Sequence, residues 1–412
     1  MTTIPFRAYR RLDRRIYFLA AMRGINTMGF SIVMPFMAMY LVDQRGVSGA
    51  AYGAIYLVAG LAAAVGNAAS GEASDRIGRR RVMIAALAGR TLNMCLLGAA
   101  VMLAAPVTVM AALIVLNAVL RAMFEPAASA AVTELAGPEL RTAAFGLQRI
   151  GINLGWALGP ALGGTLAAAH SYGTLFFFAA AVMLAAALGV TRVEDRRSHA
   201  RGEAKAERPT LASAARMFRE NRPFFAYLFL VFCGSTLTVQ QFATLSVYAK
   251  TELHLSIAHI GYLYAVNGLL VVVLQIPAVR FIDQGGPARP LLLGPLLYLA
   301  AFLAIGMGRT FGQLAGAMVV LTAGEVVFAP ALSDMAARLG DPQHLGRAFG
   351  LFGLMQQLGL SVGPLVGGSL FDAFRGRPMG LWGAIAGGMA AVATGYALFW
   401  WKWGKRVLAR VG

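Results

Sequence analysis

Long apolar segments recur along the whole chain and alternate with short polar ones. Each is long enough to cross the hydrocarbon core of a bilayer as a helix, which takes about 20 residues. Glycine and proline inside such helices are tolerated, because neighbouring helices can satisfy the freed backbone groups. The pattern therefore predicts an all-α membrane protein. The twelve predicted spans are residues 16–42, 50–72, 82–104, 107–133, 142–168, 173–191, 223–249, 256–281, 288–308, 311–337, 345–373 and 378–402.

The composition agrees with this pattern. Of the 412 residues, 58% are hydrophobic and 13% are charged, whereas soluble domains are roughly half apolar and about a quarter charged. Cys95 and Cys233 lie in separate predicted spans and have neither a disulfide framework nor a metal-ligand spacing. The chain contains no P-loop, G-x-S-x-G or H-E-x-x-H sequence. It therefore lacks the motifs that ATP-driven transport and hydrolysis require. We therefore expect no enzyme activity, no cofactor and no metal site.

Basic residues lie mostly on one side of the predicted membrane. The net charge is +18. The amino-terminal segment, the even-numbered loops and the carboxyl-terminal tail carry 27 Lys or Arg residues, and the odd-numbered loops carry five. By the positive-inside rule, this asymmetry predicts a plasma (inner) membrane protein with both termini in the cytoplasm. The basic charge then reflects topology and attraction to anionic lipids rather than nucleic-acid binding.

The sequence contains an internal repeat. Residues 124–166 align without a gap to residues 328–370, with 17 identities in 43 positions. A repeat of this length outweighs local propensities. Because six predicted helices separate the copies, the halves share one orientation, as in transporters whose central site opens alternately to either side. We predict a six-helix bundle at 1–191, a cytoplasmic linker with a short surface helix at 192–222 and a second six-helix bundle at 223–412.

The loop after the second span reads GEASDRIGRRR. As local structure it is a short basic turn in which glycine permits a tight reversal. Its order, G-x-x-x-D-R-x-G-R-R, resembles the loop 2–3 motif of the major facilitator superfamily. The resemblance implies that Asp75 caps a helix of the opposite half and that the arginines bridge to acidic groups, closing the cytoplasmic side when the transporter opens outward. The candidate gate residues are Gly71, Asp75, Arg76, Gly78, Arg79, Arg80 and Glu134.

The fifth span contains GWALGPALGG, which resembles a motif of twelve-helix drug/proton antiporters in that family. Small residues four apart let helices approach closely, and proline bends a helix. The resemblance implies packing against the other half and an export function. The eleventh span repeats the motif as GLSVGPLVGG, so symmetric packing explains much of it. The candidate packing residues are Gly155, Gly159, Pro160, Gly163 and Gly164.

Six charged side chains lie well inside the predicted spans rather than near their ends, and each is a functional candidate because burying a charge in the bilayer is costly. They are Arg23, Arg90, Arg121, Arg149, Glu125 and Glu325. Arg121 lies near the middle of the fourth span, with Asn117 and Glu125 one turn away on the same face. An Arg121–Glu125 pair either orders this helix or takes part in transport. Arg121 also resembles a helix-4 arginine of drug antiporters that is implicated in proton transfer, but Glu125 stands where that motif has glycine. Of the other three arginines, Arg23 and Arg149 either face a cavity or extend to the cytoplasmic interface.

Glu325 occupies the position that the repeat pairs with Arg121, and no basic residue lies within four positions of it. A lone carboxylate in a buried position is a candidate for binding and releasing a proton. Alternatively, Glu325 forms a salt bridge with Arg121 across a central cavity. The proton-coupling candidates are thus Glu125, Glu325 and Arg121. The candidates for lining the cavity are Arg23, Asn26, Arg90, Asn117, Arg149, Asn153, Gln240, Gln241, Asn267 and Gln356.

The resemblance to the superfamily covers essentially the whole chain. We therefore predict a proton-coupled secondary transporter that exports lipophilic or amphipathic compounds by alternating access. Its partners would be a small-molecule substrate, protons and membrane lipids, and we expect a monomer. One alternative is a proton-coupled transporter of an anionic or zwitterionic metabolite, peptide or lipid, because intramembrane arginines outnumber glutamates. Another is a passive facilitator or a non-transporting sensor.

Overall fold

The structure is a computed structural model that describes residues 9–192, 221–285, 288–340 and 345–409. Within these ranges the regular structure is helical, and no strand is present. The predicted all-α class is confirmed. The predicted surface helix of the linker lies outside the described residues.

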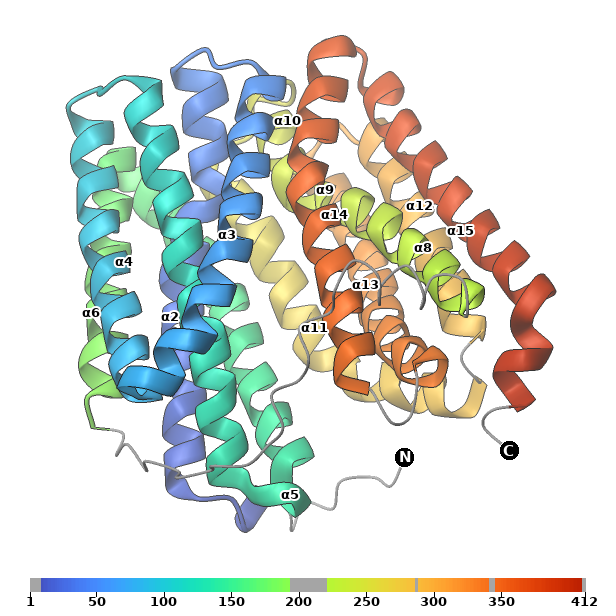
Figure 1. The fold of residues 1–412 in the computed structure, drawn as a ribbon. Coiled ribbons are helices and arrows are strands. Elements are labelled where there is room, and N and C mark those ends of the chain that lie inside the picture. The colour runs from blue at the N-terminus through green and yellow to red at the C-terminus, as the bar shows by residue number, and fades with distance from the viewer. Residues whose placement is uncertain (1–8, 193–220, 286–287, 341–344, 410–412) are drawn as a thin grey trace.

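The elements of the amino-terminal half follow the first six predicted spans (Figure 1). Asp13 begins the first helix by accepting a hydrogen bond from the backbone N–H of Arg15 at 2.8 Å. Gly78 separates the second helix from the third with a φ of 92°, a conformation that glycine adopts readily. The elements are α2 (Arg14–Met39), the π-helix η1 (Tyr40–Gln44), α3 (Gly49–Ile77), α4 (Arg79–Met102), α5 (Val107–Ala169) and α6 (Tyr172–Val190).

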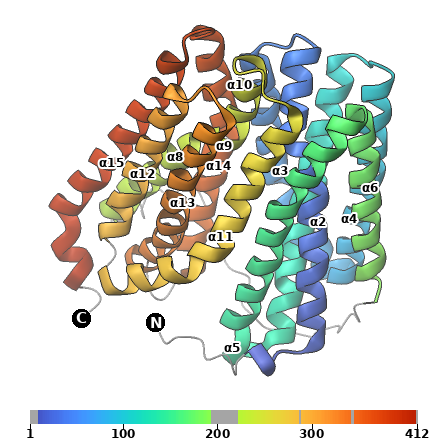
Figure 2. The ribbon, with the colours of Figure 1, turned by 180° about the vertical axis from the view of Figure 1, so that it is seen from behind.

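Helix α5 contains both the fourth and the fifth predicted span. Its backbone is helical over 63 residues, which as a straight rod would measure about 95 Å, about three times the hydrocarbon core of a bilayer. Figures 1 and 2 show instead two arms that meet at a bend. The first arm packs on α3, where Gly66 faces the carbonyl group of Val119, and the second packs on α2, where Gly24 faces the carbonyl group of Gly151.

The carboxyl-terminal half follows the other six predicted spans. The seventh span is divided into three short helices at Val239 and Thr244. A capping box formed by Thr310 and Gln313 begins the tenth span. The elements are α8 (Arg222–Thr238), α9 (Gln240–Ala243), α10 (Leu245–Thr251), α11 (Ile257–Gly285), α12 (Ala288–Met307), α13 (Phe311–Leu339), α14 (Leu345–Ala373) and α15 (Pro378–Ala409).

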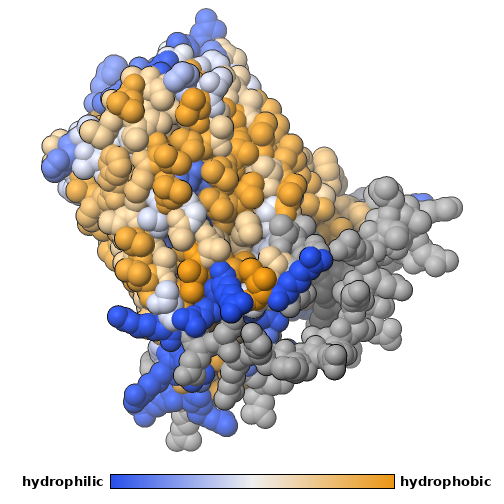
Figure 3. Space-filling view, turned by 60° about the vertical axis from the view of Figure 1, so that its left-hand side comes forward, coloured by the Kyte–Doolittle hydropathy of each residue, from blue (hydrophilic) through white to orange (hydrophobic). Residues whose placement is uncertain are grey.

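The molecule has the length and surface of a membrane-spanning bundle. Eleven candidate spans among the described residues are long and apolar enough to cross a bilayer. The second arm of α5 is not one of these eleven spans. When it is added, the described helices account for the twelve predicted spans. Figure 3 shows apolar residues around the middle of the bundle and hydrophilic residues towards its two ends.

The glycine motifs of α5 and α14 pack in the same way in the two halves. Three glycines of α5 face α2, and their repeat equivalents in α14 face α8 and α9. A β-carbon on Gly163 would lie 2.2 Å from the carbonyl oxygen of Ile32, and one on Gly359 would lie 2.5 Å from that of Phe232. Glycine at these positions is what permits the helices to approach so closely. The glycines that pack within their own half are Gly155, Gly159 and Gly163 in α5 and Gly359, Gly363 and Gly367 in α14.

The remaining members of the two motifs pack between the halves. A β-carbon on Gly164 would lie 2.9 Å from the α-carbon of Gly261, and one on Gly368 would lie 1.9 Å from the carbonyl oxygen of Gly49. The carbonyl oxygen of Pro160 also faces Gly261. Pro160 and Gly164 of the α5 motif therefore pack against the other half, whereas its other three glycines pack within their own half.

The two halves touch on one side of the bundle and are separated on the other. We call the side on which α2 begins and α15 ends the terminal side. The glycine contacts between α3 and α14 and between α5 and α11 lie towards the opposite side, where the bundles converge in Figure 1. Closer to the terminal side, Phe145 and Arg149 of α5 and Phe349 of α14 are exposed. The space between the halves is thus closed on the opposite side and open on the terminal side.

Candidate functional site

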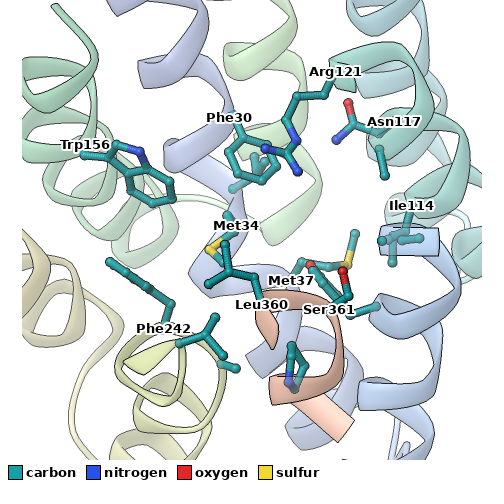
Figure 4. Close-up of a pocket in the computed structure, with 18 of the residues that line it drawn as sticks. Phe30, Met34, Met37, Ile114, Asn117, Arg121, Trp156, Phe242, Leu360 and Ser361 are labelled. Atoms are coloured by element: carbon teal, nitrogen blue, oxygen red, sulfur yellow. The ribbon is translucent and has the colours of Figure 1, made fainter. Parts of the chain in front are cut away.

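A cavity of about 670 Å³ lies between the two halves. Helices α2 to α6 line it from one half, and α9, α11, α13 and α14 line it from the other. Most of its wall is apolar, with Met34, Met37 and Leu360 among the lining side chains (Figure 4). A cavity of this size, mostly apolar and with few polar groups, is typical of a small-molecule site.

A row of three aromatic rings lies along the cavity wall and extends from one half to the other. The rings of Phe30 in α2 and Trp156 in α5 meet edge to face, with centroids 6.1 Å apart. The Trp156 ring then lies 5.2 Å from that of Phe242 in α9, which belongs to the other half. This aromatic surface offers a flat apolar contact to a ligand.

Arg121 lines the cavity without a charged partner. Its guanidinium carbon lies 5.4 Å from the centroid of the Phe30 ring, within the range of a cation–π interaction. Among the described residues it forms no hydrogen bond and no ion pair. The structure therefore does not bring Arg121 into an ion pair with Glu125 or with Glu325, the two partners considered from the sequence.

Glu125 forms its ion pair with Arg23 instead. An Arg23 Nη2 group donates to Oε2 of Glu125 and also lies 3.4 Å from the Ser129 hydroxyl. Arg23 is buried in α2, and its guanidinium group contacts α5. Neither Arg23 nor Glu125 is among the cavity-lining residues, so this pair holds α2 against α5.

Arg90 is completely buried beside the cavity wall. Its Nη1 group donates to Oδ1 of Asn26, and its Nε–H donates to Oδ1 of Asn117 at 3.3 Å. Asn117 lines the cavity, whereas Arg90 and Asn26 do not. The predicted cavity residues Arg90 and Asn26 are thus part of the support behind the wall.

Glu325 lines the cavity from the other half. The Asn267 amide donates to its Oε2 at 2.9 Å and to the Thr322 hydroxyl at 3.0 Å. Arg149 of α5 is the basic side chain whose charge acts on this carboxylate, and it lines the same cavity. Glu325, Arg149 and Asn267 therefore all line the cavity at the interface between the halves.

The other predicted polar residues divide into two groups. Asn153 and Gln356 line the cavity. Gln240 and Gln241 are buried and are not among the lining residues. The Gln240 amide donates to the carbonyl oxygen of Gly363 at 2.8 Å, so it satisfies backbone groups where the seventh span is interrupted.

The loop between α3 and α4 brings part of the candidate gate together. Arg79 forms an ion pair with Glu134 at 2.5 Å, and Arg80 donates to the carbonyl oxygen of Thr191. Arg76 lies in the last turn of α3. The side chain of Asp75 lies outside the described set, so its capping role stays a prediction.

A second polar contact, on the side opposite the termini, was not among the residues singled out from the sequence. Asp372 of α14 accepts hydrogen bonds from the first two backbone N–H groups of α3, from Gly49 at 3.0 Å and from Ala50 at 2.9 Å. A carboxylate is favoured at a helix N-terminus. The only sequence signal was an acid at the end of a span, which does not identify its partner in the other half.

The comparison with known families identifies the chain. The model described as Major Facilitator Superfamily matches residues 19–251 and 241–410, which covers both halves. The chain belongs to the Major Facilitator Superfamily. It is therefore a membrane transporter and not an enzyme.

Relatives within the superfamily match over most of their length. The chain is 26% identical over 376 residues to the uncharacterized MFS-type transporter YqjV of Bacillus subtilis (strain 168), covering 87% of each chain. It is 25% identical over 396 residues to the multidrug resistance protein MdtH of Klebsiella pneumoniae subsp. pneumoniae, covering 93% of each.

Solved structures of the superfamily share the fold. The nucleoside transporter NupG superposes with a TM-score of 0.78 at 15% identity, covering 93% of this chain and 98% of that one. The D-xylose–proton symporter superposes with a TM-score of 0.70 at 15% identity, covering 94% and 97%. These likenesses concern the fold alone.

Proposed function

We propose that the protein is a proton-coupled secondary transporter that exports amphipathic compounds across the plasma (inner) membrane. The observation that carries the proposal is the Glu325 carboxylate on the wall of the cavity between the halves. This carboxylate accepts a hydrogen bond from a neutral amide, that of Asn267. Such a carboxylate can take up a proton without first breaking an ion pair, which is what a proton carrier requires.

Alternating access supplies the transport cycle in this proposal. The bundles 1–191 and 223–412 would rock about the central cavity, connected by the linker 192–222. By the positive-inside rule the terminal side is cytoplasmic, so the described arrangement would be the one that loads from the cytoplasm. The loop between α3 and α4, with its Arg79–Glu134 pair, would close that side when the cavity opens outward.

The apolar wall supports amphipathic compounds as substrates. Methionine and aromatic side chains adapt to ligands of different shape, and they make up much of the lining. Export is supported by the glycine motif of α5 and by the similarity to a multidrug resistance protein. Transport of an anionic or zwitterionic solute is a second candidate function, favoured by the two arginines on the wall, Arg121 and Arg149.

The proposal is tested by replacing Glu325 with glutamine in protein reconstituted into liposomes. Under an imposed pH gradient, the wild-type protein should accumulate a lipophilic fluorescent dye, and Glu325→Gln should lose this gradient-driven transport while still binding the dye. Asp334→Asn is the matched control, because this acid lies on the same helix and is paired with Arg338 at 2.7 Å. It should transport like the wild type.

Two results would contradict the proposal. Undiminished gradient-driven transport by Glu325→Gln would remove Glu325 from the proton pathway, and the same assay on Glu125→Gln would then test the other acid. Dye movement by the wild type that ignores the pH gradient would instead identify a passive facilitator.

A further inference from the structure

The wall of the cavity in the amino-terminal half carries an excess of positive charge. The guanidinium groups of Arg90 and Arg121 both lie against the ring of Phe30, at 5.8 and 5.4 Å from its centroid. Glu125 is the acid whose charge acts on both of them, but its ion pair is with Arg23. One negative charge therefore lies among three positive ones, and a further negative charge beside the arginines would be stabilised.

Arg121 is the member of this group that a ligand can reach. Arg23 and Arg90 lie behind the wall, whereas Arg121 lines the cavity (Figure 4). An uncompensated charge at bilayer depth is costly. Since Arg121 has no hydrogen bond or ion pair from the described residues, its guanidinium donors remain for a bound molecule.

Asn117 supplies a second donor one helical turn away. Its side-chain oxygen accepts the hydrogen bond from Arg90 Nε at 3.3 Å, so its amide nitrogen is left as a donor at the cavity wall. Figure 4 shows Asn117 and Arg121 next to each other on the same helix. Arg90 thus orients Asn117, and the donors of Asn117 and Arg121 can serve one anionic group.

The rest of the cavity is suited to an apolar body attached to that group. The ring of Phe30 lies directly beside Arg121, and the aromatic surface continues through Trp156 to Phe242 in the other half. A ligand with an acidic end at Arg121 would therefore extend along these rings towards the carboxyl-terminal half.

We propose that Arg121 and Asn117 form an anion-binding end of the substrate site, and that the transported molecules are amphipathic compounds with an acidic group, such as an aromatic carboxylate. This inference deepens the proposed function and rests on the cavity being the substrate site. Glu325 lies in the other half, where it accepts a hydrogen bond from Asn267. The proton and the acidic group would accordingly use different side chains.

The test compares three probes of nearly equal shape, 2-naphthoate, 2-naphthamide and 2-naphthylmethylammonium, binding to the purified protein at one pH and salt concentration. A hydrogen bond to a charged group contributes about 1.5–3 kcal/mol net, which corresponds to about 10- to 100-fold in affinity. We expect the wild type to bind the carboxylate about 10- to 100-fold more tightly than the amide, and the ammonium compound most weakly.

Substitutions then locate the anion-binding group. Arg121→Gln should abolish the preference for the carboxylate, and Arg121→Lys, which keeps the charge, should retain part of it. Thr165→Ala, a neutral change on the same helix outside the cavity lining, is the control and should leave the preference unchanged. Thermal unfolding of each variant without a probe checks that it is folded, because ligand stabilisation is measured against that baseline.

Equal affinity for the three probes, or a preference that survives in Arg121→Gln but disappears in Arg149→Gln, would overturn the inference. The binding assay uses no gradient, so its outcome is independent of the proton-coupling test. If the protein transports neutral dyes in response to a pH gradient but has no preference for anions, the proposed function stands. Only the inference of an anion-binding end is then refuted.

Discussion

The contact between Asp372 and the start of α3 should control how the protein divides between its two open states. It joins the halves on the side opposite the termini, through the Gly49 and Ala50 N–H groups. When the halves separate on that side, the carboxylate and the helix N-terminus move apart and both return to water. Removing the carboxylate should therefore favour the state that is open on that side.

The size of the effect follows from the two hydrogen bonds. A hydrogen bond to a charged group contributes about 1.5–3 kcal/mol, and a helix N-cap about 1 kcal/mol. Asp372 is only partly buried, so solvent already competes for these groups, and we take about 2 kcal/mol for the whole contact. For Asp372→Ala this corresponds to about a 30-fold shift in the equilibrium, enough to raise a minor state from about 5% to about 60%.

The populations can be measured by distances between spin labels on the two halves. Leu103, between α4 and α5, and Met307, at the end of α12, are exposed on the side opposite the termini. Labels at these sites, in protein whose native Cys95 and Cys233 are replaced by serine, should report a short and a long distance. We expect Asp372→Ala to increase the long-distance population.

Asp372→Asn should have a smaller effect, because the amide keeps one oxygen acceptor but loses the charge. Asp334→Asn, paired with Arg338 on the terminal side, is the control and should leave the populations unchanged. If the distance distribution of Asp372→Ala equals that of the wild type, the reasoning from the two hydrogen bonds is refuted.

Two further predictions concern packing and buried charge. Gly368→Ala should also favour the long distance, because its β-carbon would lie 1.9 Å from the carbonyl oxygen of Gly49, whereas Gly387→Ala, with no atom within 4 Å, should not. Equal populations in the two glycine variants would contradict this. Glu125→Gln should lower the free energy of unfolding by about 2 kcal/mol, because it leaves Arg23 buried without its counter-charge. Arg23→Met combined with Glu125→Leu should lose less than the two single changes together, as measured by thermal unfolding in detergent.

Several features follow from the sequence because they depend on local properties of the chain. Span length and apolarity predict the helices, and the alignment of 124–166 with 328–370 predicts two halves of like construction. The equivalent packing of Gly163 and Gly367 against the first span of each half, α2 and the interrupted seventh span, agrees with that repeat. Charges inside spans are also visible in the sequence, and Arg121 and Glu325 do lie on the cavity wall.

The partners of those charges were decided only by the tertiary structure. Helical spacing favoured Arg121 as the partner of Glu125, but Glu125 pairs with Arg23, which is 102 positions away. Likewise, nothing local indicates that Gln240 satisfies the carbonyl group of Gly363 or that Asp372 caps α3. These contacts depend on the rotation and tilt of each helix about its axis, which are set by packing against neighbouring helices rather than by the apolar pattern. The sequence alone therefore determines which residues enter the membrane, and helix packing determines which of them meet.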